Sequence, residues 1–457
     1  MIRKSIMVLL AVAILATSGF AQASKAKWDG AKKQFALEKG VKLRVGVDND
    51  KWGTQIVAMW DRMHPEAQGA VEYVNFGSAG GIDMITQLQG EAPDVCLVVD
   101  NEIARGVQSL LNLDKILQNL GANVAMEPYF SNTNPEIKKG TVKFVPAAYN
   151  GMAFAWNKTM MEALKLDSSD KNKDGLPDAF DTWEKIFALA KKWQNDRPSY
   201  QGKPVNIVYP MSLDEVWSGY SNLTAAGWEI FKEGDPTKPG FEKAEFAKGL
   251  DFVKAASDAM ISVEANGAKT PGASMTWRWD DALNNQTAPF FLAGTWMDIN
   301  GAEVKGAYDI KFSRLPTWGG KQLTPFVASK GFVINGFSKF PSAASELYRL
   351  LFTKEGMQLM IGNSGYIPAL KAGSPINPDY SADQNKSEMN LAFKTGVIWP
   401  LPAALLPANK GKQGMDVYYN IGLNLLFRAV WDGERTPADV QAEAVKLSTD
   451  WLVSNNK

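Results

Sequence analysis

The chain of 457 residues has very little cysteine and histidine, since Cys96 and His64 are the single residues of their kinds. One cysteine excludes an intrachain disulfide and a cysteine-based zinc site. One histidine excludes a multi-histidine metal site and argues against a histidine-dependent catalytic triad. The sequence therefore points away from metal-dependent and triad hydrolases.

Net charge is also absent, because 49 Lys and Arg residues balance 49 Asp and Glu residues. A protein that binds mainly to a phosphate backbone needs a basic excess, so we exclude nucleic acid as the main partner. Hydrophobic residues make up 45% of the chain and charged residues 21%, as is typical of a folded globular protein.

A long hydrophobic run occurs only at the N-terminus. Arg3 and Lys4 precede an apolar stretch at 6–16, and Ala21-Gln22-Ala23 then forms a small-x-small pattern. This is the layout of a secretory signal peptide, and the stretch is too short to span the ~30 Å hydrocarbon core of a bilayer. We expect residues 1–23 to be removed. No cysteine follows the stretch, so we expect a periplasmic protein without a lipid anchor.

The mature chain begins with the pattern of a parallel α/β sheet. Short β-type runs at 43–47, 71–76 and 94–99 alternate with two helical patterns, the first marked by Ile56, Met59, Trp60 and Met63. The loops that follow the strands of such a sheet are where ligands bind.

The rest of the chain mixes both kinds of element. We predict strands at 142–146, 152–156, 288–296, 310–315 and 331–334, and helices at 246–260 and 347–361. The last helix has a clear start, with Thr436 as N-cap, Pro437 at N1 and Asp439 in the first turn. Periodicity alone predicts an α/β protein of two lobes.

One segment, residues 170–181, has the spacing of an EF-hand-type calcium loop. A glycine at position 6, Gly175, permits the sharp turn that such loops need. The predicted ligands are Asp170, Asn172, Asp174, Leu176 through its backbone carbonyl, Asp178 and Asp181. We expect a structural calcium ion here. The alternative is a polar surface turn, which favours the same residue types.

Several segments, taken in order, carry a family pattern. They are Gly-Met-Ala-Phe-Ala-Trp-Asn-Lys at 151–158, Thr-Trp-Glu-Lys-Ile at 182–186, Gly-Thr-Trp at 294–296, Leu-Pro at 315–316, Gly-Phe-Val-Ile at 331–334, Gly-Tyr-Ile-Pro-Ala at 365–369 and Thr-Pro at 436–437. Over about residues 41–453 the chain thereby resembles bacterial extracellular solute-binding proteins of the maltose-binding type. It departs from them at Thr295, where the family has proline, and in the calcium loop.

The resemblance implies a periplasmic binding protein-like fold of type II, with two discontinuous lobes around a hinge. We expect an N-terminal lobe of residues 41–147 plus 300–336 and a C-terminal lobe of residues 148–299 plus 337–457. The chain should then cross near 146–150, 298–301 and 335–338.

The resemblance also implies that the protein captures a solute between its lobes and presents it to the membrane permease of an ABC importer. Stacking aromatics combined with Asp, Asn and Glu side chains suit a sugar. The candidate ligand-binding residues are Asp50, Lys51, Trp52, Ser78, Asp100, Asn101, Asn150, Glu215, Trp217, Trp228, Trp296 and Tyr419. Two alternatives stay open at single positions. A tryptophan can be a core residue, as we expect for more than half of the 15, and Asp50 and Asp100 can be helix N-caps.

We therefore predict a monomeric, non-enzymatic receptor for a di- to tetrasaccharide. A charged small solute, such as glycerol phosphate or a polyamine, is the alternative ligand. A secreted carbohydrate-active enzyme that uses Asp100 and Glu215 is the less favoured alternative function.

Overall fold

The computed structural model describes residues 26–113, 116, 142–205, 207–211, 213, 216–231, 233–260, 262–263, 269–270, 279–370, 373–381, 383–395, 399–400, 405–409 and 411–457. The predicted signal peptide lies outside these residues. Within them, no helix is long and apolar enough to cross a membrane. The chain forms two compact units: unit 1 is Met1–Tyr149 with Ser329–Pro378, and unit 2 is Asn150–Ala328 with Asp379–Lys457.

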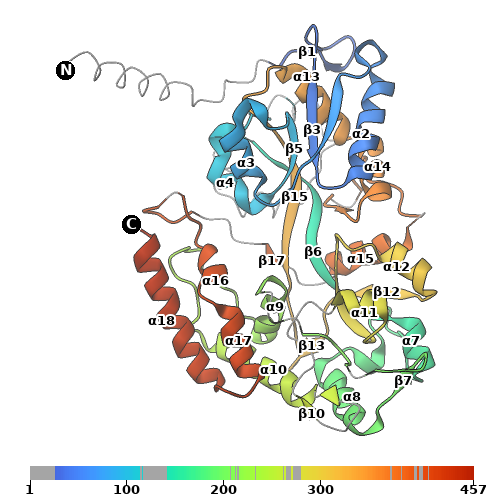
Figure 1. Ribbon diagram of the computed structural model, residues 1–457, viewed down its shortest axis with the longest axis vertical. Helices are drawn as coiled ribbons and strands as arrows, with labels where there is room; N and C mark the ends of the chain where they lie inside the picture. The colour runs from blue at the N-terminus through green and yellow to red at the C-terminus, as the bar shows by residue number, and fades with distance from the viewer. Residues whose placement is uncertain are drawn as a thin grey trace, which may run out of the picture. The chain divides into compact units, whose positions relative to one another are not determined.

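Unit 1 is an α/β unit whose elements come from both ends of its discontinuous sequence (Figure 1). They are β1 (Trp28–Asp29), β2 (Gln34–Phe35), β3 (Leu43–Val47), α2 (Asp50–Met63), β4 (Val71–Asn75), α3 (Gly81–Leu88), β5 (Val95–Val99), α4 (Ile103–Gly106), α13 (Pro341–Leu351), α14 (Lys354–Asn363) and β16 (Ile367–Pro368), together with parts of β6 (Val145–Asn157) and β15 (Phe326–Ile334). The predicted strand at 43–47 is confirmed.

The sheet of unit 1 runs in the order β4-β3-β5-β15-β6. β3 is parallel to β4 and β5, whereas β15 is antiparallel to β5. Side chains alternate across β5: Val95 and Leu97 belong to one buried cluster, and Cys96 and Val98 to another. Both faces of the sheet are therefore covered, which explains why β5 is apolar at every position.

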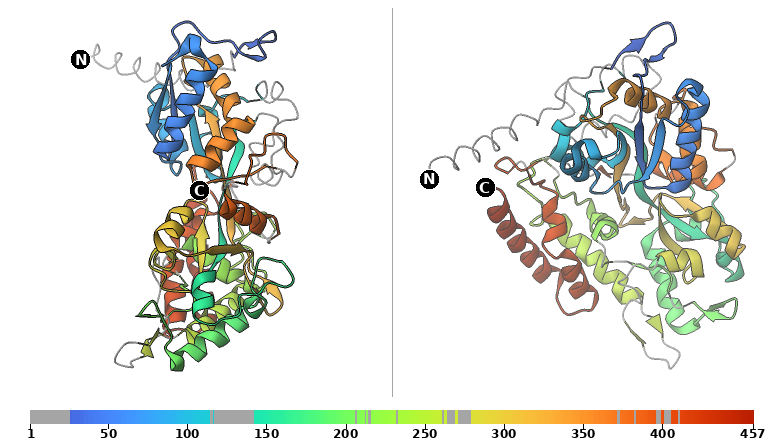
Figure 2. Two further views of the ribbon diagram at one scale, coloured as in Figure 1. Left: turned by 90° about the vertical axis from the view of Figure 1, so that its right-hand side faces the viewer. Right: turned by 45° about the horizontal axis from the view of Figure 1, so that its top comes forward.

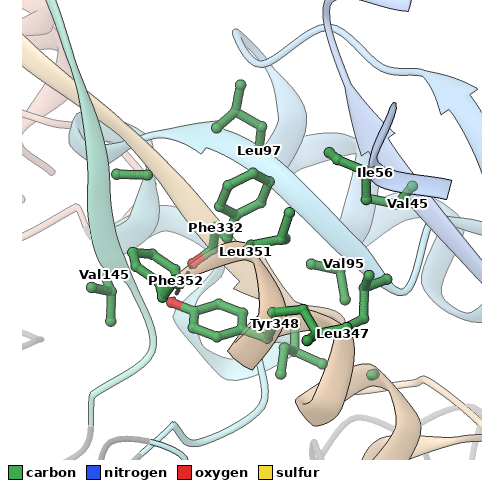
Figure 3. Close-up of a cluster of buried hydrophobic side chains, with 14 of the residues drawn as sticks. Val45, Ile56, Val95, Leu97, Val145, Phe332, Leu347, Tyr348, Leu351 and Phe352 are labelled. Carbon is green, nitrogen blue, oxygen red and sulfur yellow. Dashed lines mark hydrogen bonds between the residues drawn. The ribbon is translucent and has the colours of Figure 1, made fainter. Parts of the chain in front are cut away.

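The larger cluster lies under α2, α13 and α14. Figure 3 shows Leu347, Tyr348 and Leu351 of α13 against Phe332 of β15, and the Tyr348 hydroxyl donates to the Phe332 carbonyl at 3.1 Å. Figure 2 shows the same helices beside α2. Sequence periodicity predicted one helix at 347–361, but the chain makes two, because Thr353 ends the first and caps the second through Gly356 N–H.

The segment before β3 is fastened to α13. The Glu38 carboxylate accepts hydrogen bonds from the Ser342 and Ala343 amides at 2.7 and 2.9 Å. It thus caps α13 from outside the helix. Phe35 N–H donates at 2.9 Å to Glu346, a residue of α13 that is fully buried.

The single histidine of the chain belongs to the same junction. His64 Nε2 lies 3.2 Å from Glu346 Oε1, and Nδ1 lies 3.3 Å from Glu66 Oε1. Burial by itself lowers the pKa of His64, but its hydrogen bonds to the two carboxylates outweigh burial, and the pKa is raised. Arg349 also pairs with Glu346, so His64 shares that buried carboxylate with a second cation.

Unit 2 is mainly helical around short strands. Its elements are the remainder of β6 and β15, with α7 (Lys158–Ala163), α8 (Trp183–Asp196), β7 (Ser199–Tyr200), β8 (Lys203–Pro204), α9 (Val216–Leu223), α10 (Ala244–Ala259), β9 (Ser262–Val263), β10 (Lys269–Thr270), α11 (Trp279–Asn285), β11 (Phe290–Gly294), α12 (Ile299–Gly306), β12 (Ile310–Ser313), β13 (Thr317–Trp318), β14 (Lys321–Gln322), α15 (Gln384–Thr395), β17 (Trp399–Pro400), α16 (Asp416–Asn420), α17 (Leu423–Trp431) and α18 (Pro437–Asn455). The predicted capping of the last helix by Thr436 and Asp439 is confirmed.

The unit boundaries differ from the predicted lobes at two of three crossings. Residues 300–328 belong to unit 2, because β12 pairs with β6 in the part that follows Tyr149. Residues 337–378 belong mostly to unit 1, because α13 and α14 cover its sheet. The chain therefore crosses at Tyr149–Asn150, inside β15 at Ala328–Ser329, and at Pro378–Asp379, rather than near 298–301 and 335–338.

Candidate ligand-binding site

In unit 1, a buried polar cluster lies where β3 ends. The Ser78 hydroxyl, the Lys330 ammonium and the Tyr366 phenol all donate to Oδ2 of Asp48, at 2.7, 2.9 and 2.8 Å. The Lys330 nitrogen also bonds to the Tyr366 hydroxyl and lies 4.6 Å from the centre of its ring. Burial, followed by the nearby Asp48 charge, raises the pKa of Tyr366, so the phenol keeps its proton.

One hydrogen-bond acceptor of this cluster, the second carboxylate oxygen of Asp48, is not used by any described residue. Oδ1 of Asp48 is buried and has no hydrogen-bond partner among the described residues. A buried carboxylate oxygen is costly unless it is hydrogen-bonded, so a solute hydroxyl or a water molecule suits this position. The carboxyl end of a parallel strand is also where α/β sheets bind their ligands.

The predicted residues next to this cluster have different roles. Asp50 is exposed and accepts hydrogen bonds from Tyr73 at 2.6 Å and Asn75 at 2.8 Å, which lower its pKa. Burial and the Asp50 interaction raise the pKa of Tyr73 to about 12. Asp50 is not the N-cap of α2, because Asn49 accepts from the Trp52 amide at 2.9 Å.

Asp100 is 4% exposed, and its Oδ2 accepts from both the amide and the hydroxyl of Ser329, at 2.9 and 2.8 Å. Asn101 follows it in a short 3₁₀ turn, and the side chain of Asn101 lies outside the described part of the chain. Lys51 is exposed on α2.

Trp52 is a correction to the predicted site. Its side chain is 1% exposed and packs edge-on against Phe332 and Tyr366, with ring centres 5.7 and 6.1 Å apart. It is a core residue because position 3 of α2 faces the sheet. Its indole packs against the Tyr366 ring and offers no exposed surface on which a sugar could stack.

In unit 2, two predicted tryptophans lie together. The ring centres of Trp217 on α9 and Trp296 after β11 are 6.0 Å apart, at an interplanar angle of 52°. Trp296 is 39% exposed, so part of its indole surface is open to solvent. We call these two residues the aromatic platform.

Backbone geometry fixes one half of the platform. A Cβ atom added at Gly294 would lie 2.6 Å from the Trp296 ring, so the indole rests directly on the glycine backbone. The Gly294 amide donates to Met297 Sδ at 3.0 Å and closes the turn. The Gly-x-Trp sequence therefore allows the strand to end with an indole folded back across it.

The remaining predicted residues of unit 2 are spread more widely. Tyr419 on α16 is 41% exposed and lies edge-on to Tyr418, whose hydroxyl bonds to the Val216 carbonyl next to Trp217. Asn150 is partly buried on β6 at the crossing between the units. Glu215 lies outside the described residues.

Trp228 is the second correction. It is 1% exposed, its indole N–H donates to the Gly240 carbonyl at 2.7 Å, and its ring packs against Phe246 with centres 5.0 Å apart. The side chain is held in the core among helices, because the segment around Gly240 folds over it. A buried indole with a satisfied N–H cannot stack on a solute.

The predicted calcium loop makes a tight turn around Gly175, whose φ is +88°. Asp170 accepts hydrogen bonds from the amides of Asp174 and Gly175, at 3.2 and 2.9 Å. Arg314 donates to Asp174 at 2.7 Å, and Lys185 donates to Asp181 at the same distance. Within the described residues, no three His, Cys, Asp or Glu side chains converge as a metal cluster. Calcium therefore stays a prediction.

Comparison with known proteins gives the class. The family model of bacterial extracellular solute-binding proteins matches residues 66–387, which is most of the chain. The chain belongs to this family of extracytoplasmic receptors. Comparison with curated protein sequences gives no match.

Solved structures with the same fold are two-lobe periplasmic binding proteins. A cyclo/maltodextrin-binding protein in complex with maltotetraose has 20% identity and a TM-score of 0.66, over 91% of this chain and 98% of that one. The maltose-binding periplasmic protein of Listeria monocytogenes, in complex with maltose, has 18% identity and a TM-score of 0.66, over 91% and 99%. MalX of Streptococcus pneumoniae, in complex with maltopentaose, has 18% identity and a TM-score of 0.64, over 90% and 100%. The predicted fold class is thereby confirmed.

Sequence reasoning missed three members of the Asp48 cluster. Asp48, Lys330 and Tyr366 come from distant segments that only the sheet order brings together. A signal for two of them was present, because Asp48 ends the first predicted strand and Tyr366 lies in a segment that carries the family pattern.

Proposed function

We propose that the protein is the substrate receptor of an ABC importer for an oligosaccharide. The aromatic platform is the observation that carries this proposal. A pyranose presents an apolar C–H face that packs on an indole, and Trp217 with the partly exposed Trp296 offers two such surfaces. Three related folds were solved with maltose or longer maltodextrins, which suggests glucose oligomers as the first ligands to test.

Charge in unit 1 argues against an anionic solute. The ammonium of Lys330 is already paired with Asp48. The N-terminus of α3, where an anion would otherwise bind, is occupied by the Glu102 carboxylate, which accepts from the Gly80 amide at 2.9 and 3.0 Å. A glycerol phosphate would meet no uncommitted cation at either point.

A polyamine is also disfavoured by the contacts in unit 1. Both Asp50 and Asp100 already accept hydrogen bonds from neighbouring side chains. A carboxylate that is engaged in this way attracts an ammonium group less than a free one does. The enzyme alternative loses support in the same way, since Asp100 is bound to Ser329 and buried.

Titration calorimetry with maltose, maltotriose, maltotetraose and maltopentaose tests this proposal. Spermidine and glycerol 3-phosphate serve as comparison ligands, and chromatography of the sugar after incubation tests for hydrolysis. We expect binding of at least one maltodextrin, no binding of the charged solutes and no shorter products. Binding of a charged solute alone would contradict the sugar assignment, and released glucose would favour the enzyme.

The finer points of localisation are part of the proposal. We place cleavage of a signal peptide after Ala23 and expect a soluble, monomeric mature chain without a lipid anchor. N-terminal sequencing of the exported protein and its elution volume on a sizing column check both points. A lipid-modified or dimeric product would contradict them.

We also propose that the loop 170–181 holds a structural calcium ion. Oxygens of Asp170, Asn172 and Asp174 surround the Gly175 turn, and Asp174 would have to exchange Arg314 for the ion. If calcium binds the folded state, 100 times its Kd adds roughly 2.7 kcal/mol of stability. Melting temperatures are compared in millimolar calcium and in EDTA, with Asp174→Asn as the variant. Equal temperatures for the wild type would rule out the site.

A further inference from the structure

The chain enters unit 1 within a strand, and the residues at that point are held by side chains from other strands. β15 passes from unit 2 to unit 1 between Ala328 and Ser329. Its pairing with β5 begins at Lys330, opposite Val99, and continues to Ile334. Ser329 thus lies just beyond the register that β5 offers, while β6 flanks the other edge of β15 and Phe326 and Val327 pair with β17.

Where the pairing with β5 ends, two carboxylates accept the hydrogen bonds of Ser329 and Lys330. Asp100, the residue after Val99, accepts from the Ser329 amide at 2.9 Å and from its hydroxyl at 2.8 Å. Asp48, at the end of β3, accepts from the Lys330 ammonium at 2.9 Å. Ser329 is fully buried and Lys330 nearly so, which excludes water as a substitute partner and strengthens each contact.

We propose that these four residues, Asp48, Asp100, Ser329 and Lys330, form an anchor that fixes β15 in unit 1 and thereby sets the affinity for solute. On the edge of β15 that faces β5, ladder bonds begin at Lys330, and the anchor extends this support by one residue, to the boundary between the units. Asp100, predicted as a ligand residue, acts here as a positioning residue instead.

The anchor affects the affinity for solute through the conformational entropy that the connecting backbone loses on binding. Proteins with two units joined by short connections bind solutes with hinge movement, and a hinge whose position is fixed loses less entropy on binding. An anchor that is loosened leaves more backbone to be ordered when the solute binds. This second part rests on the proposed function, whereas the fixing of β15 does not.

The decisive variant is Ser329→Ala, with Ser338→Ala as a matched control. Both remove a serine hydroxyl that donates to a carboxylate of unit 1, since Ser338 bonds to the partly buried Asp94. Ser338 lies beyond the opposite end of the β5 pairing, after Ile334. Each substitution removes one hydrogen bond of a serine hydroxyl, and only the first touches the connection.

Two measurements separate the anchor from a merely structural hydrogen bond. Hydrogen exchange in the solute-free protein reports on the peptide 326–334, and titration with maltotetraose reports on affinity. In Ser329→Ala we expect exchange in that peptide to be faster by about fivefold or more, and the Kd to rise about fivefold, the equivalent of one net hydrogen bond. Ser338→Ala should change neither beyond its effect on the melting temperature.

The outcomes separate the two parts. Equal exchange of 326–334 in the two variants would overturn the anchor. Faster exchange with an unchanged Kd would overturn its link to affinity. If the wild type binds none of the sugars, the proposed function fails, and the exchange comparison alone still decides whether the anchor exists.

Discussion

In unit 1 the candidate ligand groups are polar and already bonded to one another, whereas in unit 2 they are aromatic and partly exposed. Asp48 gathers three donors before any solute arrives. Trp296 is 39% exposed, and its ring lies against Gly294 and Trp217. The polar set is rigid and suited to fixing orientation, and the platform is suited to supplying apolar contact area.

The difference teaches how each unit should respond to substitution. Residues of the Asp48 cluster are part of the folded structure of unit 1, so changing them should lower stability and affinity together. The platform residues contribute less to the core, so changing them should lower affinity alone. The predictions below test this contrast.

The largest difference in stability is expected between variants of a buried and of a partly exposed tryptophan of unit 2, Trp228 and Trp296. Trp228→Ala leaves a core cavity and removes the hydrogen bond from the indole to the Gly240 carbonyl, and should cost roughly 3–5 kcal/mol of unfolding free energy. Trp296→Ala should change unfolding little but weaken sugar binding by about 1–3 kcal/mol, or roughly 5- to 150-fold. Urea unfolding measures the change in stability of each variant, and titration calorimetry measures its sugar affinity. A stability loss of equal size in both variants would break the contrast.

The next effect concerns the cation of the Asp48 cluster. Lys330→Met leaves the Asp48 carboxylate partly buried with fewer donors, which should cost about 2 kcal/mol of unfolding free energy and also weaken sugar binding. Lys254→Met is the control, because Lys254 pairs with Asp258 on an exposed face of α10 and should change stability by less than about 0.5 kcal/mol. Lost affinity with full stability would show that Lys330 contacts the solute directly.

A smaller effect should come from moving an indole without removing it. Gly294→Ala places a methyl group where the Trp296 ring lies, so the ring must shift. We expect about tenfold weaker binding, or ~1.4 kcal/mol, with little change in unfolding. Gly362→Ala is matched, because a methyl group there meets nothing within 4 Å. Unchanged affinity in Gly294→Ala would remove Trp296 from the platform.

The smallest effect concerns pH and the junction around His64, away from both sets of ligand groups. The pKa of His64 is raised in the folded state, so its contribution is complete below the unfolded value of 6.5 and is lost as pH rises through the folded one. Burial raises the pKa of Glu346, but Arg349 and His64 outweigh burial and lower it, so its contribution is lost at acid pH, below about 4.5.

Stability of the wild type should therefore fall as pH rises from 6 to 9. In His64→Gln this slope should shrink, and stability at pH 6 should drop by about 1 kcal/mol, the usual value of one net hydrogen bond. Melting curves across this range measure both. Since none of the candidate ligand-binding residues belongs to this junction, sugar affinity at pH 6 should stay unchanged.

Individual elements of both units could be predicted where their local signals agree. The run at 43–47 and the helix after it follow simple periodicity, and Thr436 with Asp439 marks the start of α18. The lobe boundaries could not be predicted, because periodicity does not say which sheet a helix covers. Helices α13 and α14 return to unit 1 only because their apolar faces match α2 and the sheet.

For the site, residue type predicted chemistry better than it predicted exposure. Trp52, Trp228 and Trp296 look alike in sequence, yet the first two are 1% exposed and the third 39%. Their neighbours separate them. Strand β15 covers Trp52 through Phe332, and α10 covers Trp228 through Phe246. Gly294, in contrast, lets Trp296 lie across a strand end. The Asp48 cluster needed pairing over 282 and 318 residues, which local pattern does not contain.

The bonds between the first residues and α13 also impose an order on folding. Phe35 and Glu346 are separated by 311 residues, so unit 1 cannot close until chain beyond residue 346 is present. Most of unit 2, at 150–328, is continuous and can form earlier. Contacts of such long range slow folding, because a long loop must be closed before the contact is gained. A chain whose first strands must wait in this way therefore remains partly unfolded for longer.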